Sequence, residues 1–352
     1  MAVTRDPRDL LAERTATGEL FEKLEGGKVR CFACAHRCTM ADGQEGACRV
    51  RLNRGGSLQV PFGYVSGIQL DPIEKKPFYH VLPGSRTLSF GMLGCSFRCL
   101  WCQNWETSQI RKDPDAGGRI QETSPAEIAG LCRETGTPVL TSTYNEPMIT
   151  AEWARAVMGE ARGGGVRGAV VSNGHGTSQV LDYLAPVVDF WKIDLKGFDA
   201  KRYRAMTTGG LEAVLETIRA VHARGKWLEV VTLIVPEVND TDDELKAMAG
   251  FLASVSKDIP WHVTAFRPEY RMADQKATPA ATLLRACEAG KAAGLRFVYA
   301  GNLPGQTGKW EHTSCPGCGA VLVERHGFTI LANRIANGAC PSCKLTIPGV
   351  WG

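Results

Sequence analysis

At residues 94–104 the chain reads GCSFRCLWCQN, a CxxxCxxC motif placed directly after a predicted strand at 87–92. Three thiolates on one short loop can hold three corners of a cubane iron-sulfur cluster and leave the fourth iron open. A zinc site would want a fourth ligand close by, and neither Gln103 nor Asn104 is a good one. A purely structural cluster or a zinc loop is the competing interpretation.

The sequence that follows this motif alternates strand-like and helix-like segments. The predicted strands are 87–92, 138–143, 168–172, 188–194, 227–235, 261–266 and 296–300. Between them, apolar residues recur at helical spacing in 125–134, 151–161, 177–184, 211–223, 242–256 and 282–293. Strands separated by helices require parallel pairing, so the pattern predicts an α/β sheet or barrel.

Polar residues gather where the predicted strands end. In a barrel of this kind the chemistry lies at the C-terminal ends of the strands. Those ends carry, in chain order, Cys95, Asn145 with Glu146, Ser172 with Asn173, and Asp194 with Lys196, while the sixth strand carries His262 and Arg267. The sequence therefore predicts a catalytic mouth at this edge.

Two CPxC knuckles lie near the end of the chain. Cys315 and Cys318 form the first, and Cys340 and Cys343 form the second after 21 intervening residues. This spacing is typical of a closed four-cysteine zinc ribbon, with a hairpin expected at 321–325 and 328–331. A rubredoxin-like iron is the alternative. Because such a site has no open position, its role would be structural or in partner docking.

A third cysteine group lies near the start of the chain. It comprises Cys31, Cys34, Cys38 and Cys48, with His36 as an additional possible ligand. Four thiolates could bind zinc or an auxiliary 4Fe-4S cluster, and the spacing does not decide between them, although a compact knuckle slightly favours zinc. The two remaining cysteines, at 132 and 287, are expected to be buried core thiols.

Composition excludes several classes of protein. The chain has 352 residues with 41 Lys and Arg against 37 Asp and Glu, a balance too even for a dedicated nucleic-acid binder. No window has the 18 apolar residues of a membrane span, and residues 1–27 lack the apolar core of a signal peptide. We therefore expect a soluble, cytoplasmic protein in which eleven of the 13 cysteines serve metals and not disulfides.

Taken together, the motifs resemble those of radical S-adenosylmethionine (radical SAM) enzymes, and specifically the radical SAM protein of the AmmeMemoRadiSam system, a family related to the activating enzymes of pyruvate formate-lyase. The segments that carry the resemblance are the first cysteine group with Gly46 to Arg51, the Cys95 motif with Gln103 to Trp105, Thr143 to Pro147, Trp261 with His262, Phe266 to Pro268, Tyr299 to Asn302, and the terminal ribbon ending in Gly349 to Trp351. One departure is Arg267, where the family pattern has a histidine. It hints at an anionic group nearby.

The resemblance implies a partial (βα)6-type barrel at 61–305, preceded by a four-cysteine module at 1–60 and followed by a zinc ribbon at 306–352. It also implies that Cys95, Cys99 and Cys102 hold a 4Fe-4S cluster whose open iron chelates SAM. An electron from the cluster would then cleave SAM to a 5'-deoxyadenosyl radical that abstracts a hydrogen atom.

The residues expected to line the SAM site are Trp101, Asn104, Glu146, Asn173, Asp194, Lys196 and His262. Glu146 would meet the SAM ammonium, or else simply start the helix at Pro147. Asp194 and Lys196 would contact SAM, or form an ion pair at a strand end. His262 would lie near SAM, or be a structural histidine of its strand.

The outcome of the reaction is less constrained, because this fold hosts many reactions. Our first choice is modification of a protein or peptide side chain. Activation of a glycyl-radical enzyme is the second choice, and a non-catalytic zinc and iron-sulfur scaffold is the third. The expected cofactors are a 4Fe-4S cluster, SAM and Zn2+. The expected partners are reduced flavodoxin or ferredoxin as electron donor, together with Memo-type and AMMECR-type proteins.

Overall fold

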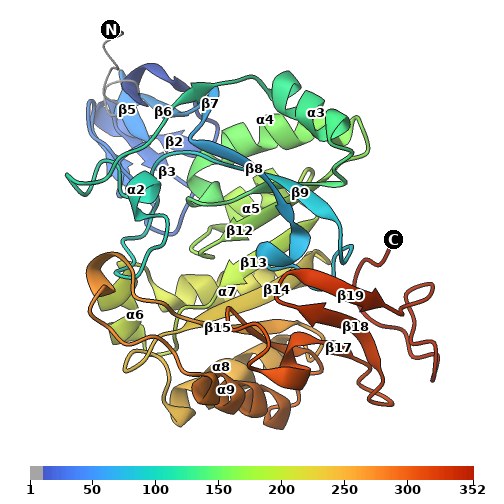
Figure 1. The fold of residues 1–352 in the computed structure, drawn as a ribbon. Coiled ribbons are helices and arrows are strands. Elements are labelled where there is room, and N and C mark those ends of the chain that lie inside the picture. The colour runs from blue at the N-terminus through green and yellow to red at the C-terminus, as the bar shows by residue number, and fades with distance from the viewer. Residues whose placement is uncertain (1–10) are drawn as a thin grey trace, which may run out of the picture.

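The computed structural model describes residues 11–352 (Figure 1). The first ten residues, which belong to the predicted N-terminal module, lie outside the described residues. A single sheet of eight strands forms the centre, in the order β16-β15-β14-β13-β12-β11-β9-β8. Its parallel strands are β9 (Arg86–Gly91), β11 (Val139–Ser142), β12 (Arg167–Ser172), β13 (Phe190–Asp194), β14 (Trp227–Ile234), β15 (Trp261–Ala265) and β16 (Val298–Gly301). The predicted α/β fold with a parallel sheet is confirmed.

One strand of this sheet was not predicted. β8 (Gly67–Pro72) pairs with β9 in antiparallel fashion and forms one edge, while β16 forms the other. Its sequence, GIQLDP, has few apolar residues and a proline, which is typical of an edge strand. The sheet therefore stays open between β8 and β16.

Helices connect the parallel strands, and the longer ones cover one face of the sheet, whereas the short helix at Trp105–Ser108 lies beside the N-terminal strands (Figure 1). They are α2 (Trp105–Ser108), α3 (Pro125–Glu134), α4 (Ala151–Arg162), α5 (Ser178–Leu184), α6 (Ala200–Thr207), α7 (Leu211–Ala223), α8 (Asp242–Val255) and α9 (Ala280–Ala292). Six of them match the predicted helical segments within about two residues, because the apolar period and the capping residues are local signals. The exceptions are α2 and α6. No helix among the described residues is long and apolar enough to cross a membrane.

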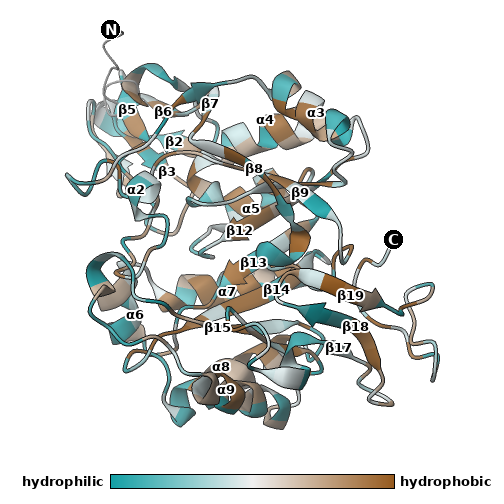
Figure 2. Ribbon diagram, in the orientation of Figure 1, coloured by the Kyte–Doolittle hydropathy of each residue, from teal (hydrophilic) through white to brown (hydrophobic). Residues whose placement is uncertain are grey.

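Successive side chains along a strand of the main sheet point alternately into the hydrophobic core and into a cavity on the opposite face. On β13, Trp191 and Ile193 are buried in the core, while Lys192 and Asp194 line a cavity on the other side. Successive residues of a strand point to opposite faces, which explains this division. Figure 2 shows apolar residues concentrated on the central strands and on the helix faces that pack against them.

The N-terminal segment packs onto the same core as the sheet. It forms two small antiparallel sheets, one of β1 (Thr15–Thr17), β6 (Ser57–Pro61) and β5 (Leu52–Arg54), the other of β2 (Phe21–Lys23), β3 (Val29–Cys31) and β4 (Thr39–Met40). β7 (Tyr64–Val65) then pairs with β10 (Gln121–Glu122). Short 3-10 helices complete the chain at Glu25–Gly27, Ile73–Lys75, Pro147–Thr150, Tyr270–Met272 and Gly308–Glu311.

The C-terminal segment packs beside β16, one edge of the main sheet. Its strands are β17 (Thr313–Ser314), β18 (Val321–His326) and β19 (Thr329–Asn333), so the predicted hairpin is confirmed. On one side the buried Leu322 and Ile347 pack with Tyr299 of β16. On the other side Val350 bridges to Val81, in the segment that leads into β9. The segment thus packs against β16 and against the residues that connect β8 to β9.

Candidate active site

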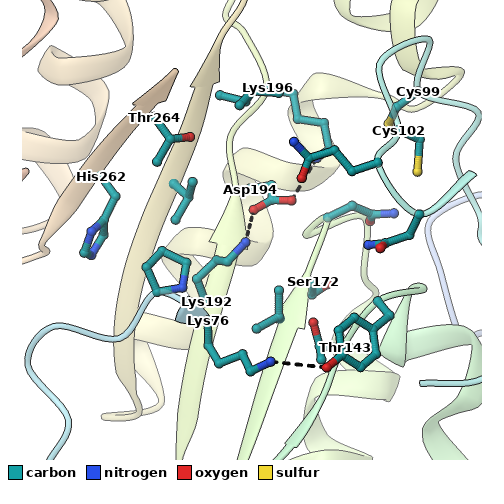
Figure 3. Close-up of a pocket in the computed structure, with 18 of the residues that line it drawn as sticks. Lys76, Cys99, Cys102, Thr143, Ser172, Lys192, Asp194, Lys196, His262 and Thr264 are labelled. Atoms are coloured by element: carbon teal, nitrogen blue, oxygen red, sulfur yellow. Dashed lines mark hydrogen bonds and ion pairs between the residues drawn. The ribbon is translucent and has the colours of Figure 1, made fainter. Parts of the chain in front are cut away.

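A cavity of about 400 Å³ lies where the parallel strands end, beside the CxxxCxxC loop. Its walls are formed by side chains from the central sheet, the cysteine loop and the C-terminal hairpin (Figure 3). They include Lys75, Lys76, Tyr79, Cys95, Cys99, Trp101, Cys102, Asn104, Thr143, Asn145, Ser172, Asn173, Lys192, Asp194, Lys196, His262, Thr264, Asn302 and Phe328. This volume lies within the range of small-molecule and cofactor sites.

The cysteine loop is held in one conformation by its backbone. Gly94 has φ +89°, and a side chain there would meet a methyl group of Val50 at 2.6 Å, so the position needs glycine. The amide of Arg98 donates to the carbonyl of Thr207 at 2.8 Å, and that of Leu100 donates to Met206 at 3.1 Å. The C-terminal end of α6 therefore holds the loop in place.

The three loop cysteines place their sulfur atoms on the cavity wall. The amide of Phe97 donates to Cys95 Sγ at 3.4 Å, and Ser108 Oγ lies 3.3 Å from Cys102 Sγ. Burial raises the pKa of the Cys95 thiol to about 12 and raises the pKa values of Cys99 and Cys102 as well. Without a cation these thiols keep their protons, and a bound iron cluster would supply the positive charge that ionises them.

A triad of charges lies opposite the cysteines. Lys196 Nζ donates to Asp194 Oδ2 at 2.8 Å, and Lys192 Nζ donates to the other carboxylate oxygen (Figure 3). Burial alone would raise the pKa of Asp194, but the two lysines outweigh it and hold that pKa at about 2. The triad carries a net positive charge. Lys192 was missed from the sequence, although it stands two residues before Asp194 and so on the same face of the strand.

Glu146 does not line the cavity. Its carboxylate accepts hydrogen bonds from the amide of Met148 at 3.1 Å and from Ser172 Oγ and the amide of Asn173, both at 2.7 Å. It therefore caps the 3-10 helix Pro147–Thr150 and ties the end of β11 to the end of β12. Burial raises the pKa of Glu146 to about 7. This is the second of the two roles expected for it, the start of a helix at Pro147.

His262 lines the cavity but lies deep in it, on β15. Its Nε2 is 2.6 Å from Glu229 Oε2, and its ring stacks on Tyr299 with centroids 5.1 Å apart. Glu229 also accepts from the amides of Tyr79 and His80. Burial lowers the pKa of His262, against the opposing effect of Glu229. The histidine is thus fixed by partners on three segments.

The other predicted residues divide into two sets. Trp101, Asn104 and Asn173 line the cavity, and Asn173 Nδ2 donates to Ser96 Oγ at 3.1 Å. Arg267 is exposed and takes no part in the cavity wall. Phe328 reaches the cavity from the turn between β18 and β19, a contact that no sequence signal indicated.

Two further cysteine groups lie away from this cavity. Cys315, Cys318, Cys340 and Cys343 place all four sulfurs within 4.8 Å of one another, so a C-terminal four-cysteine site is present. The four N-terminal cysteines line a second, smaller cavity. Cys132 and Cys287 are buried in the core, as expected.

Comparison with known proteins points to one family. Residues 91–252 match the Radical SAM superfamily. An uncharacterized protein of Methanocaldococcus jannaschii is 38% identical over 327 residues, which cover 92% of this chain and 96% of that protein. The isethionate sulfite-lyase activating enzyme of Oleidesulfovibrio alaskensis is 23% identical over 248 residues, covering 52% of this chain and 80% of that protein. The pyruvate formate-lyase-activating enzyme of Clostridium pasteurianum is 23% identical over 178 residues, covering 49% and 71%.

The matched region begins at the last residue of β9 and contains the cysteine loop, the charge triad and four complete parallel strands, β11 to β14. Sequence and geometry therefore agree on the same segment of the chain. The chain belongs to the Radical SAM superfamily, with activating enzymes among its homologues, and it is a radical SAM enzyme.

Proposed function

We propose that Cys95, Cys99 and Cys102 hold a 4Fe-4S cluster whose open iron binds SAM. The observation that carries this proposal is the wall of the main cavity, where three cysteines of one loop, one buried and two half-buried, face a charged triad and no fourth cysteine joins them among the described residues. When bound, such a cluster supplies the electron for reductive cleavage of SAM, from which a 5'-deoxyadenosyl radical starts the reaction on the substrate.

The protein's own residues then have distinct tasks. Lys196 offers a positive charge to the SAM carboxylate, while Asp194 suits its ammonium or ribose hydroxyls. Trp101, Asn104 and Asn173 complete the wall beside the cysteines. Glu146 acts on the site indirectly, because it accepts a hydrogen bond from the amide of Asn173 and so fixes the position of that residue in the cavity wall.

His262 and its partners close the floor of the cavity. The ring is buried, it is hydrogen-bonded to Glu229, and Tyr79 and Tyr299 pack against it. Tightly packed, buried side chains at this end of the cavity exclude water from a reactive intermediate, which water would otherwise quench. We propose that His262 forms the deep end of the cavity that binds SAM.

For the substrate, we propose a protein or peptide side chain. The names of the relatives support a second candidate, since activating enzymes act on partner enzymes and two of them align with half of this chain. The C-terminal four-cysteine module favours the first candidate, because it adds a surface beside the cavity. A scaffold without catalysis would bind SAM weakly or not at all.

The wider setting is also a proposal. We propose that the chain is the radical SAM component of the AmmeMemoRadiSam system, that it acts in the cytoplasm with Memo-type and AMMECR-type proteins, and that reduced flavodoxin or ferredoxin supplies its electrons. The three modules proposed from the sequence, 1–60, 61–305 and 306–352, would then be a metal module, the barrel and a ribbon that binds Zn2+.

The proposal is tested with anaerobically reconstituted protein, dithionite and SAM. Wild type should release 5'-deoxyadenosine, whereas Cys99→Ala should release none and should lose about four irons. Cys287→Ala, which removes a buried thiol on α9 far from any cysteine group, is the matched control and should behave as wild type. An iron-loaded wild type that releases no 5'-deoxyadenosine would favour the scaffold.

A further inference from the structure

The four N-terminal cysteines come together around a single small cavity. Cys31 ends β3, and its amide donates to the carbonyl of Cys38 at 3.0 Å, so a tight loop carries three of the four. Cys31, Cys34 and Cys48 are buried, and Cys38 is half-buried. Four thiols converging on one cavity form a complete ligand set for a metal group.

The spacing of the sulfurs separates a single ion from a cluster. Around one tetrahedral zinc with bonds of 2.3 Å, the sulfurs lie about 3.8 Å apart. The C-terminal group has this spacing, with Cys315 Sγ 3.5 Å from Cys343 Sγ and Cys318 Sγ 3.7 Å from Cys340 Sγ. Within residues 11–352, no other group of three or more cysteine, histidine or acidic side chains has its ligand atoms within 4.8 Å of one another.

The N-terminal sulfurs are therefore spaced more widely than a single ion requires, as are those of the catalytic loop. A cubane cluster produces such spacing, because each cysteine binds a different iron. Backbone amides already point at two of the sulfurs, from Ala33 to Cys31 at 3.5 Å and from Ala47 to Cys38 at 3.3 Å. Hydrogen bonds to the sulfurs are one means by which proteins tune iron-sulfur clusters.

His36 does not join this group, although the sequence offered it as a ligand. Its Nε2 lies 3.2 Å from the carbonyl oxygen of Ser96, and its ring packs against His175 with centroids 4.7 Å apart. The ring is also absent from the wall of the cysteine cavity. A mixed cysteine and histidine zinc site is therefore disfavoured.

The group borders the catalytic loop without opening into its cavity. A Cβ on Gly94, the residue before Cys95, would lie 3.4 Å from the carbonyl oxygen of Cys48. His36 touches Ser96, the residue after Cys95. The two cavities share no lining residue, so a substrate in the main cavity does not reach the N-terminal group. This placement suits electron transfer and not substrate binding.

We infer that Cys31, Cys34, Cys38 and Cys48 hold an auxiliary 4Fe-4S cluster that delivers electrons to the catalytic cluster. A one-electron reductant of the flavodoxin or ferredoxin class reduces the auxiliary cluster, which returns to its oxidised state when the same electron passes on. The electron-delivery part rests on the proposed function, whereas the metal content does not.

Metal content and electron paramagnetic resonance test the cluster in the full chain. Anaerobically reconstituted wild type should hold about eight irons and one zinc. The double variant Cys34→Ser and Cys48→Ser should lose about four irons and keep a signal that SAM alters, while Cys99→Ala should keep about four irons with a signal that SAM does not alter. If wild type holds about four irons and two zincs, or if Cys99→Ala holds no iron, the inference of an auxiliary cluster is wrong.

Comparison of two reductants tests electron delivery. In the double variant, the yield of 5'-deoxyadenosine with reduced flavodoxin should fall relative to the yield with dithionite, a small reductant that can reach the catalytic cluster directly. Ser342→Ala, in the C-terminal knuckle, is the control and should keep the wild-type ratio. If the double variant keeps the wild-type ratio of the flavodoxin yield to the dithionite yield, the auxiliary cluster does not deliver electrons to the catalytic cluster. If neither reductant yields product in wild type, the proposed function fails, and the iron content of Cys99→Ala still decides the second cluster.

Discussion

Glu229 is the buried carboxylate that joins the floor of the cavity to two other segments. It accepts hydrogen bonds from the amides of Tyr79 and His80, from Trp227 Nε1 at 3.0 Å and from His262 Nε2 at 2.6 Å. Burial alone would raise the pKa of Glu229, but the hydrogen bond and charge of His262 outweigh it and hold the pKa at about 2. A carboxylate with so many donors is expected to be important for stability.

We predict that Glu229→Gln lowers the free energy of unfolding by about 2–4 kcal/mol at neutral pH, because an amide cannot accept at both positions. Since the folded-state pKa is depressed, the stabilising effect is complete above the unfolded pKa of about 4.5 and is lost as pH falls towards about 2. Denaturant unfolding at neutral and acidic pH should show the deficit shrinking as pH falls. Glu216→Gln, exposed on α7, should change little at either pH. A deficit that grows with acid would contradict this prediction.

Asp194 offers a second prediction at the scale of one residue. Without its carboxylate, Lys192 and Lys196 would be left as two unneutralised cations in the wall of the cavity. Asp194→Asn should weaken SAM binding by about tenfold or more, the usual cost of removing one partner of a buried charge pair. Equilibrium binding measurements on the reconstituted protein would check it. Asp182→Asn, which breaks the exposed pair with Arg224, serves as control and should bind SAM as wild type does.

Among the elements, α3 has the clearest local signal. Ser124 accepts from the amide of Glu127 at 3.2 Å, and the Glu127 carboxylate accepts from the amide of Ser124 at 2.7 Å, which completes a capping box ahead of Pro125. This reciprocal pair satisfies two backbone donors at the start of the helix. The start of α3 could therefore be predicted to the residue.

We predict that Ser124→Ala destabilises the protein by about 1 kcal/mol, because the amide at the third helical position loses its acceptor. Denaturant unfolding would measure the change. Ser178→Ala provides a comparison, since that hydroxyl lies inside the first turn of α5 and bonds only to the neighbouring Gln179 at 3.3 Å. A loss at Ser178 as large as that at Ser124 would argue against the capping explanation.

The elements that the sequence did not predict share a physical cause. α6 has only Tyr203 and Thr207 buried, so its sequence shows no apolar stripe. β8 is stabilised by its pairing with β9, and residues on an edge strand need not be apolar. The short N-terminal strands form because the chain packs onto the sheet's core. In each case tertiary contacts, and not local preference, determine the structure.

The same distinction applies to the site. Cys95, Asp194 and Lys196 follow predicted strands, and the edge rule for parallel sheets placed them together. Lys76 and Phe328 also reach the cavity, but they come from the segment after β8 and from the C-terminal hairpin. Contacts between residues so distant in sequence depend on how the whole chain folds, so no local pattern could indicate them.

For the whole molecule, the decisive feature is the contact between the C-terminal segment and the residues that lead from β8 to β9. Arg325 of the C-terminal hairpin is buried there, donating to the carbonyl of Tyr79 at 2.8 Å and to Thr313 Oγ1 at 2.7 Å. Tyr299 OH on β16 lies 2.6 Å from His80 Nε2 and 2.9 Å from Thr313 Oγ1. The C-terminal segment is therefore bonded to β16 at one edge of the sheet and to the segment between β8 and β9.

We predict that Cys318→Ser loses about one zinc per chain and frees the C-terminal segment, because the site would keep only three of its four thiolates. Limited proteolysis should then cut between residues 306 and 352, while the iron content stays as in wild type. Ser342→Ala, in the same knuckle, should resist cleavage. If the Cys318→Ser variant is not cut, packing against the rest of the protein holds the C-terminal segment in place without its metal.

Phe328 stands at the tip of the C-terminal hairpin, in the turn between β18 and β19, and forms part of the wall of the main cavity. That portion of the wall belongs to the C-terminal segment with its four-cysteine site and not to the sheet. If these cysteines hold the proposed zinc, the shape of the cavity depends on an ion that exchanges no electrons, and a shortage of zinc would change substrate selectivity before it changed the cleavage of SAM.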